Sequence, residues 1–263
     1  MRRSVLSGLW IALAASVSFA GDLKVANVFG DHMVLQQEKP VRVWGWGEPG
    51  GAIAVSFGSE DAARTASATV EADGSWAITL DAMTKSFEGR ELVIESGEER
   101  VSFTDVLVGE VWVCGGQSNM EWTLRSSRDA DVEVESADTP GVRYLRLPKV
   151  AHIEPQSDFP VKEGANGGDW RLCLREEASD CTGVGYYFAR RLRRRLDVPV
   201  GLIDNSWGGT MAQHWVTQET LRGFPEVQPY FDDIEAQLAA WEEGGGAEGA
   251  ERRFKEDTAA WEE

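Results

Sequence analysis

Cysteine, histidine and basic residues are all scarce in this chain. Its 263 residues include three cysteines and three histidines, and none of them has the Cys/His spacing of a zinc site. We therefore expect no metal centre. The 26 basic residues are outnumbered by 44 acidic ones, which gives a formal net charge of -18. An acidic protein repels nucleic acids and anionic membrane surfaces, so neither is expected as a partner.

Long apolar segments are also scarce, and the one that occurs lies at the N-terminus. Residues 5–17 are mostly apolar and follow Arg2 and Arg3. This stretch is shorter than the ~20 residues that span a bilayer, and Ser18-Phe19-Ala20 offers the small residues of a cleavage site. We predict that residues 1–20 are a signal peptide and that the mature chain is secreted or periplasmic, with no membrane segment after cleavage. A retained membrane anchor is the alternative.

A short apolar strand that leads into a serine is the most informative local pattern. Val111–Trp122 reads VWVCGGQSNMEW, in which Gly115 and Gly116 give the backbone freedom for a sharp turn before Ser118. A serine at such a strand-to-helix turn exposes its hydroxyl, and the first helical amides face the oxyanion that forms when it attacks a carbonyl. Ser118 is therefore a candidate nucleophile for ester hydrolysis, although Met120 replaces the second glycine of the general elbow pattern. An ordinary Asn/Ser/Gly turn is the alternative.

The first part of the mature chain has the pattern of an antiparallel β domain. Short segments rich in valine, isoleucine, tryptophan and threonine are separated by turn sequences at residues 48–51, 72–75 and 95–98. Regular short strands with such turns are typical of a sandwich. We predict a β-sandwich domain over residues 21–105.

From residue 106 the pattern changes to alternating strands and helices. Apolar strands are expected at Leu107–Cys114, Val142–Leu147 and Val200–Asp204, with a helix from about Gly183 to Leu196. The five arginines between positions 190 and 195 would coat the solvent side of that helix. The order predicts a parallel sheet with helices on its faces and a site at the carboxyl ends of its strands.

The last part of the chain, residues 216–263, has a helical and strongly acidic pattern. Phe231, Ile234, Leu238 and Trp241 share one helical face, and three glycines at 244–246 interrupt it before a second apolar pattern begins. We predict a charged helical hairpin. A disordered acidic tail is the alternative.

Two of the three cysteines are close in sequence. Cys173 and Cys181 would close a short loop, and a disulfide between them in an exported protein would add ~2–3 kcal/mol of stability. Cys114 lies in the strand before the nucleophile turn, where we expect a buried and unpaired thiol.

Three blocks of the sequence resemble a known family. Gly109–Trp112 followed by Gly116–Trp122 resembles the nucleophile block of the sialate O-acetylesterase family, which belongs to the SGNH hydrolases. Gly201–Thr210, GLIDNSWGGT, is similar to that family's second block, and Asp31–Gly50 is similar to the start of its β domain. The resemblance implies a β-sandwich followed by an incomplete three-layer α/β/α, flavodoxin-like domain over residues 106–263. Residues 216–263 would form a helical insertion in it.

For function, the resemblance implies a carbohydrate O-acetylesterase that acts on an O-acetylated sugar or polysaccharide without a metal or organic cofactor. Ser118 would attack the acetyl carbonyl, and its own amide with that of Gly208 or Gly209 would bind the oxyanion. The residues that would hold the turn or contact the sugar are Gln117, Asn119, Trp122 and Trp207.

The catalytic base has no clear candidate among the histidines His32, His152 and His214. The resemblance places the family's catalytic Asp and His beyond position 263, so we expect a truncated chain with weak esterase activity. The two alternatives from other functional classes are a noncatalytic carbohydrate-binding protein that uses the β domain, and an interaction or adhesion protein built on the acidic helices.

Overall fold

The computed structural model describes residues 23–58, 63–152, 155–160 and 167–262. The predicted signal peptide, residues 1–20, lies outside the described residues. The chain divides into two compact units, residues 1–208 and 209–263. Within the described ranges, no helix combines the length and the apolar character needed to cross a membrane.

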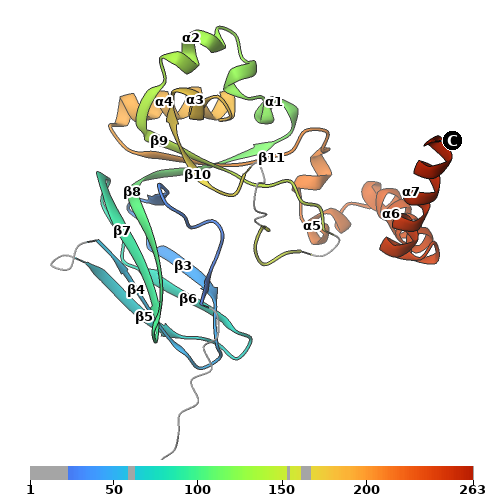
Figure 1. Cartoon of the computed structure of the whole chain (residues 1–263), viewed down its shortest axis with the longest axis horizontal. Helices are drawn as coiled ribbons and strands as arrows, with labels where there is room; N and C mark the ends of the chain where they lie inside the picture. Colours follow the sequence, from blue (N-terminus) through green and yellow to red (C-terminus); the bar gives the residue numbers. More distant parts are fainter. Residues whose placement is uncertain (1–22, 59–62, 153–154, 161–166, 263) are drawn as a thin grey trace, which may run out of the picture. The chain divides into compact units, whose positions relative to one another are not determined.

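The N-terminal part of the first unit contains two sheets that share a core (Figure 1). One is antiparallel with the strand order β1-β3-β6, whose bounds are Lys24–Val25, Val41–Trp46 and Ser75–Leu80. The other begins with the antiparallel order β5-β4-β7-β8, whose bounds are Arg64–Thr69, Ala52–Phe57, Ser86–Ser96 and Glu99–Gly116. Strand β2, Val34–Gln36, pairs in parallel with the middle of β8.

Alternation of side chains explains why these strands enclose a core. In β4, Ile53, Val55 and Phe57 are buried while the residues between them face outward. In β6, Trp76, Ile78 and Leu80 are buried in the same way. These side chains belong to one apolar cluster. The short antiparallel strands predicted before residue 106 are therefore present.

Strand β8 passes without interruption from the antiparallel part of the large sheet into its parallel part. Its first part pairs antiparallel with β7, and Glu110–Gly116 pairs in parallel with β11, Val200–Ser206. The predicted domain boundary at 105/106 thus falls inside a single strand. Asp105 has a left-handed φ of 53° at this point, and its carboxylate accepts hydrogen bonds from the buried Arg143 at 2.9 Å and from His32 at 2.8 Å.

The second region of this large sheet has the strand order β10-β9-β11-β8. Strand β9, Asp138–Arg146, and β8 both run parallel to β11, whereas β10, Trp170–Leu174, is antiparallel to β9. The prediction that Leu107–Cys114 and Val200–Asp204 pair within one parallel sheet is confirmed. Strand β10 was not predicted.

Helices cover one face of this region (Figure 1). They are α1 Ser118–Glu121, η1 Leu124–Ser126 (a 3-10 helix), α2 Ala130–Glu135, α3 Arg175–Ala178 and α4 Gly183–Leu196. The bounds of α4 match the prediction. Its buried Tyr186 and Ala189 lie in the same cluster as Tyr144 and Leu202 of the sheet.

The opposite face of the sheet is covered differently from the expected three-layer arrangement. Leu145, Ile203 and Trp170 pack into the core of the β region together with the N-terminal residues Phe29 and Met33. Among the described residues of this unit, the helices therefore form one layer, and the predicted second helical layer is replaced by the N-terminal segment. The structure does have the expected mixed α/β architecture, with parallel strands in its large sheet.

The three cysteines lie in the helix-covered core. Cys114, Cys173 and Cys181 are all buried and free, and the Cys181 thiol hydrogen bonds with Cys173. The predicted Cys173–Cys181 disulfide is therefore not present in the structure, and its formation in an oxidising compartment stays a prediction. Burial and the charge of Asp204 raise the pKa of Cys114 to about 11, which fits the unreactive, structural thiol expected there.

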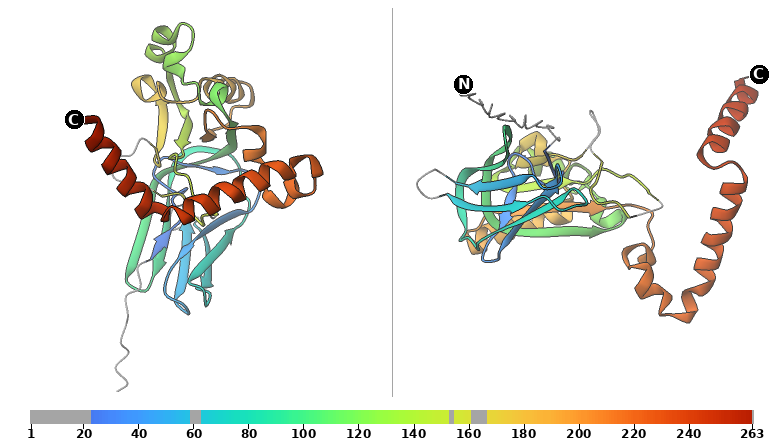
Figure 2. Two further views of the ribbon diagram at one scale, coloured as in Figure 1. Left: turned by 90° about the vertical axis from the view of Figure 1, so that its right-hand side faces the viewer. Right: turned by 90° about the horizontal axis from the view of Figure 1, so that it is seen from below.

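The second unit is helical (Figure 2). Its elements are η2 Ala212–Trp215, α5 Gln218–Arg222, η3 Pro225–Val227, α6 Gln228–Glu243 and α7 Gly246–Glu262. The predicted pair of helices and the glycine interruption are confirmed, with Gly245 at a φ of 88° in the break. Phe231 is buried, but Trp241 is 40% and Trp261 87% exposed, so the apolar face predicted for the hairpin is only partly covered within this unit.

Candidate active site

Ser118 lies where the carboxyl ends of β8 and β11 meet. Gly116 ends β8 with a φ of 144°, a conformation that favours glycine, and Ser118 then begins the short helix α1. The last residues of the two strands pair as Ser206 with Gly116, and the Trp207 amide donates to the Gly116 carbonyl at 2.9 Å. The strand, glycine turn and helix predicted around the candidate nucleophile are therefore formed at the predicted edge of the sheet.

The Ser118 hydroxyl is bonded to the residue before it. Its Oγ donates to Gln117 Oε1 at 2.5 Å, and the Ser118 amide donates to the same oxygen at 2.9 Å. Gln117 thus acts as the N-cap of α1. The prediction that Gln117 helps to hold the turn agrees with these two bonds, and both polar hydrogens of Ser118 point to its side chain.

Gly208 lies next to Ser118, the candidate nucleophile. A Cβ atom added to Gly208 would be 3.7 Å from Ser118 Oγ. The Gly208 amide donates to Glu121 Oε2 at 2.5 Å. The predicted oxyanion donors Ser118 and Gly208 are therefore both engaged by side-chain oxygens in this structure. Gly209, with a φ of 82°, is the first residue of the second unit.

A charged network surrounds Glu121. Its other carboxylate oxygen is in contact with Lys149 Nζ and lies 3.7 Å from a guanidinium nitrogen of Arg146. Arg146 also lies 4.0 Å from the carboxylate of buried Asp204, which accepts hydrogen bonds from the amide and hydroxyl of Ser206. These ion pairs connect the nucleophile turn to β9 and β11.

Open hollows lie beside the nucleophile. One of about 490 Å³ is lined by Gln117, Ser118, Asn119, Met120 and Val184. A second, of about 480 Å³, shares Asn119 and Val184 with it and adds Trp122 and Tyr187. The Trp122 ring is 56% exposed, and its Nε1 donates to the Ser126 carbonyl at 2.8 Å, which fixes its orientation. Three of the four predicted substrate contacts, Gln117, Asn119 and Trp122, therefore line space next to Ser118.

Trp207, the fourth predicted substrate contact, lies at the end of β11 and is 37% exposed. Its position between Ser206 and Gly208 puts it beside the same sheet edge.

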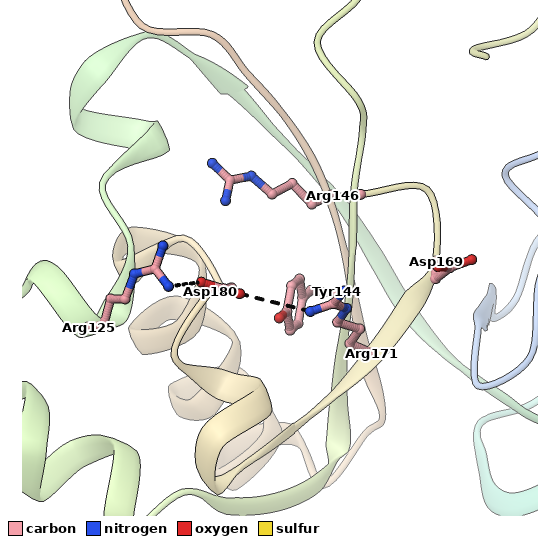
Figure 3. A pocket seen from close by; sticks show the side chains of 7 residues that line it. Arg125, Tyr144, Arg146, Asp169, Arg171 and Asp180 are labelled. Atoms are coloured by element: carbon pink, nitrogen blue, oxygen red, sulfur yellow. Dashed lines mark ion pairs between the residues drawn. The ribbon is translucent and has the colours of Figure 1, made fainter. Parts of the chain in front are cut away.

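A separate polar pocket of about 160 Å³ lies at β9 and β10 (Figure 3). In it Arg125 and Arg171 both pair with Asp180, at 2.6 and 3.9 Å. Arg146 extends across the pocket in Figure 3, so one side chain borders both this pocket and the Glu121 network.

The described histidines make local contacts. Among the described residues of the first unit, no histidine forms a hydrogen bond with Ser118. His32 pairs with Asp105 in the β region, and His152 is exposed in a loop. In the second unit, His214 Nδ1 accepts the Met211 amide at 3.0 Å, and its ring lies 6.3 Å from that of Tyr230. The structure therefore assigns His32 and His214 to local contacts.

Glu121, Lys149 and Arg146 were missed as site residues. Ser118 and Glu121 have the S-x-x-E spacing of a capping box, which would direct Glu121 back to the start of α1. The structure instead directs it to Gly208, 87 residues away in sequence. The S-x-x-E spacing alone suggests only a capping role, and no local pattern identifies so distant a partner.

Ser118 lies in a strand–turn–helix beside parallel strands. This arrangement defines the class of protein, an α/β protein that displays a serine as hydrolases do. Comparison with known proteins gives the family. Residues 108–240 match the family described as carbohydrate esterase, sialic acid-specific acetylesterase. The chain belongs to this family, which confirms the resemblance of its sequence blocks.

Individual relatives agree with this assignment. The chain is 29% identical to human sialate O-acetylesterase, in an alignment that covers 81% of this chain and 42% of the human protein. It is 27% identical to the mouse sialate O-acetylesterase, in an alignment that covers 88% of this chain and 47% of the mouse protein. A crystal structure of a carbohydrate acetylesterase from Xanthomonas citri aligns with a TM-score of 0.70 at 33% identity, over 76% of this chain and 44% of that one. The chain thus spans less than half the length of these relatives.

Proposed function

We propose that the protein is a carbohydrate O-acetylesterase in which Ser118 is the nucleophile. The observation that carries this proposal is the position of Ser118 at the turn between β8 and α1, beside Gly208. Family membership supports the ester chemistry, and the names of the relatives support an O-acetylated sugar as the substrate.

In the proposed reaction, Ser118 Oγ attacks the carbonyl carbon of the acetyl ester. The Oγ–carbon bond forms, the bond to the sugar oxygen breaks, and the serine proton passes through a base to the leaving sugar hydroxyl. Water then hydrolyses the acetyl-serine to acetate. The amides of Ser118 and of Gly208 or Gly209 are the proposed oxyanion donors. Gln117, Asn119, Trp122 and Trp207 are the proposed substrate contacts.

The hydrogen bonds around Ser118 set conditions on this reaction. Gln117 Oε1 accepts both the hydroxyl and the amide hydrogen of Ser118, so a substrate carbonyl must displace it. Because a positioned base contributes ~10²–10⁴-fold and no described histidine bonds to Ser118, we expect slow turnover by this chain.

We further infer the finer features of the fold from the sequence. Residues 21–105 are assigned to a β-sandwich and residues 106–263 to part of an SGNH hydrolase domain with a helical insertion from 216. Residues 1–20 are assigned to a signal peptide, which makes the mature protein secreted or periplasmic. The shared core of the two N-terminal sheets and the parallel strands after residue 106 support the first two assignments.

The proposal is tested by acetate release from a chromogenic acetyl ester and from an O-acetylated sugar. The wild-type chain is compared with Ser118→Ala and with the control Ser136→Ala, which removes an exposed hydroxyl at the end of α2. We expect slow release that Ser118→Ala abolishes and Ser136→Ala leaves unchanged. Equal release by all three proteins would refute the role of Ser118, and release no faster than in buffer alone would favour a noncatalytic carbohydrate-binding protein.

A further inference from the structure

Glu121 joins two segments that are distant in sequence but meet at the nucleophile. Its Oε2 atom accepts the Gly208 amide hydrogen at 2.5 Å, and the two residues are 87 positions apart. Glu121 is the last residue of α1, whose first residue is Ser118. One side chain therefore links the helix that carries the nucleophile to the loop after β11.

The surroundings of Glu121 favour a negatively charged acceptor. Its carboxylate is only a quarter exposed, and it contacts Lys149 and faces Arg146 at 3.7 Å. Nearby cations stabilise the ionised form, and a charged acceptor makes a shorter and stronger hydrogen bond than a neutral one. The bond to Gly208 is therefore expected to be strong and well ordered.

Steric fit shows how closely Gly208 is held. A Cβ atom at position 208 would lie 2.7 Å from Glu121 Oε2, closer than a Cβ atom approaches another heavy atom, so Glu121 would have to shift. The same atom would be 3.7 Å from Ser118 Oγ. Gly208 thus fits between Glu121 and the nucleophile because it lacks a side chain.

We propose that Glu121 is a positioning residue that fixes the Gly208 peptide beside Ser118, with Lys149 and Arg146 holding its carboxylate in place. The catalytic consequence of this positioning rests on the proposed function of Ser118. The Gly208 amide donates to Glu121, so a substrate carbonyl would have to displace Glu121 before this amide could bind an oxyanion, just as it would have to displace Gln117 at the Ser118 amide. In this proposal Gly208 sets the course of the loop that follows β11 beside Ser118.

The hydrogen bond is tested directly by hydrogen exchange of the Gly208 amide, which requires no activity. Labelling tryptophan with carbonyl ¹³C and glycine with ¹⁵N selects the three Trp-Gly pairs of the chain, whose amides belong to Gly45, Gly47 and Gly208. Gly45 and Gly47 lie in or next to β3 and serve as internal controls for general loosening of the fold. In wild-type protein we expect slow exchange at Gly208.

Two substitutions separate the hydrogen bond from the charge. Glu121→Ala should accelerate exchange at Gly208 by about tenfold or more while Gly45 and Gly47 stay unchanged. Glu121→Gln retains an acceptor oxygen and should accelerate exchange at Gly208 only a few-fold. The control Glu135→Gln removes an exposed carboxylate of α2 and should change nothing. If Glu121→Ala does not fold, Lys149→Met is used instead, because it removes the cation that contacts Glu121. Gly208 exchange should then rise by less than is expected for Glu121→Ala.

Two results would overturn the proposal. One is unchanged Gly208 exchange in Glu121→Ala, or in Lys149→Met if the alanine variant does not fold. The other is equal acceleration at all three glycines, which would show that Glu121 acts through general stability.

Kinetics then test the catalytic consequence. Where the wild-type chain shows Ser118-dependent acetate release, Glu121→Ala should lower kcat by about 10- to 100-fold with little change in KM, and Glu121→Gln should restore it to within a few-fold. A changed KM with unchanged kcat would contradict a positioning role. Absence of Ser118-dependent release in the wild type would refute the proposed function, while the exchange result would still decide the role of Glu121.

Discussion

At the scale of single residues, the nucleophile turn is built from side chains that act on one another at short range. Gln117 holds Ser118 through two hydrogen bonds, and Glu121 holds Gly208 through one. The exposed oxygen of Ser118 is thereby oriented before any substrate arrives. A side chain so constrained gives well-defined geometry for attack, but its hydroxyl has to change partner before it can transfer a proton.

The buried thiols predict a loss of stability at alkaline pH. Burial raises the pKa of Cys114 to about 11, and the bond to Cys173 together with burial raises the pKa of Cys181 well above 9.0. Below pH 9 these thiols keep their protons in both the folded and the unfolded chain, so stability is unaffected. As the pH rises from about 9 to 11, the unfolded chain loses these protons first, and the free energy of unfolding falls.

Urea unfolding between pH 8 and 11 measures this effect. The wild-type chain should lose stability steadily above pH 9, and Cys114→Ala should lose less over the same range because one of the titrating groups is gone. Parallel curves for the two proteins would show that Cys114 does not titrate as its burial implies.

The residues of the site differ in how far sequence could predict them. Ser118, its glycine turn and the neighbouring Gly208 were predictable because each lies in a compact motif with its own local geometry. Glu121 and Lys149 were not, because their partners come from other elements. The short Cys173–Cys181 spacing predicted proximity correctly, and the two side chains are in contact as thiols.

At the scale of elements, α4 supports the turn that carries Ser118. Buried Thr182 is its N-cap: its Oγ1 accepts the Gly185 amide at 3.5 Å and donates to the Met120 carbonyl of α1 at 2.5 Å. The Thr182 hydroxyl thus caps the first turn of α4 and also holds the neighbouring helix α1. Because these groups are buried, loss of the hydroxyl leaves both without a partner.

Substitutions at Thr182 test this support. Thr182→Val keeps the shape but removes the hydroxyl, and it should destabilise the protein by ~1–3 kcal/mol. Thr182→Ser keeps the hydroxyl and should cost less than Thr182→Val, as measured by urea unfolding. If the valine variant were as stable as wild type, the hydroxyl would have no part in holding the two helices.

Elements were predictable where their patterns are local. The helical spacing of apolar residues gave α4 with its observed bounds, and the two helices of the second unit followed from the same periodicity. The continuity of β8 was not predictable, since its sequence changes pattern at residue 106 while its backbone stays extended on both sides of Asp105. Strand β10 is too short and irregular, with a register shift after Leu172, to stand out from loop sequence.

At the scale of the whole molecule, the first unit contains both the β region and Ser118, the proposed nucleophile. Strand β8 runs through both the antiparallel and the parallel part of the large sheet, and residues of the N-terminal segment pack against the face of the parallel part where helices were expected. The β region is therefore part of the support for the sheet that carries Ser118. The second unit, from Gly209 onward, is a separate helical body with much of its aromatic surface exposed.

The central claim is that Ser118 forms a covalent acetyl-enzyme, and peptide mass mapping after incubation with an activated acetyl ester tests it most directly. An activated ester has a good leaving group and acylates Ser118 with less help from a base than hydrolysis of the acetyl-serine needs, so the adduct should accumulate. We predict one acetyl group on the peptide that contains Ser118, located on that serine and absent from Ser118→Ala. Acetylation confined to lysines, identical in the wild type and Ser118→Ala, would contradict it.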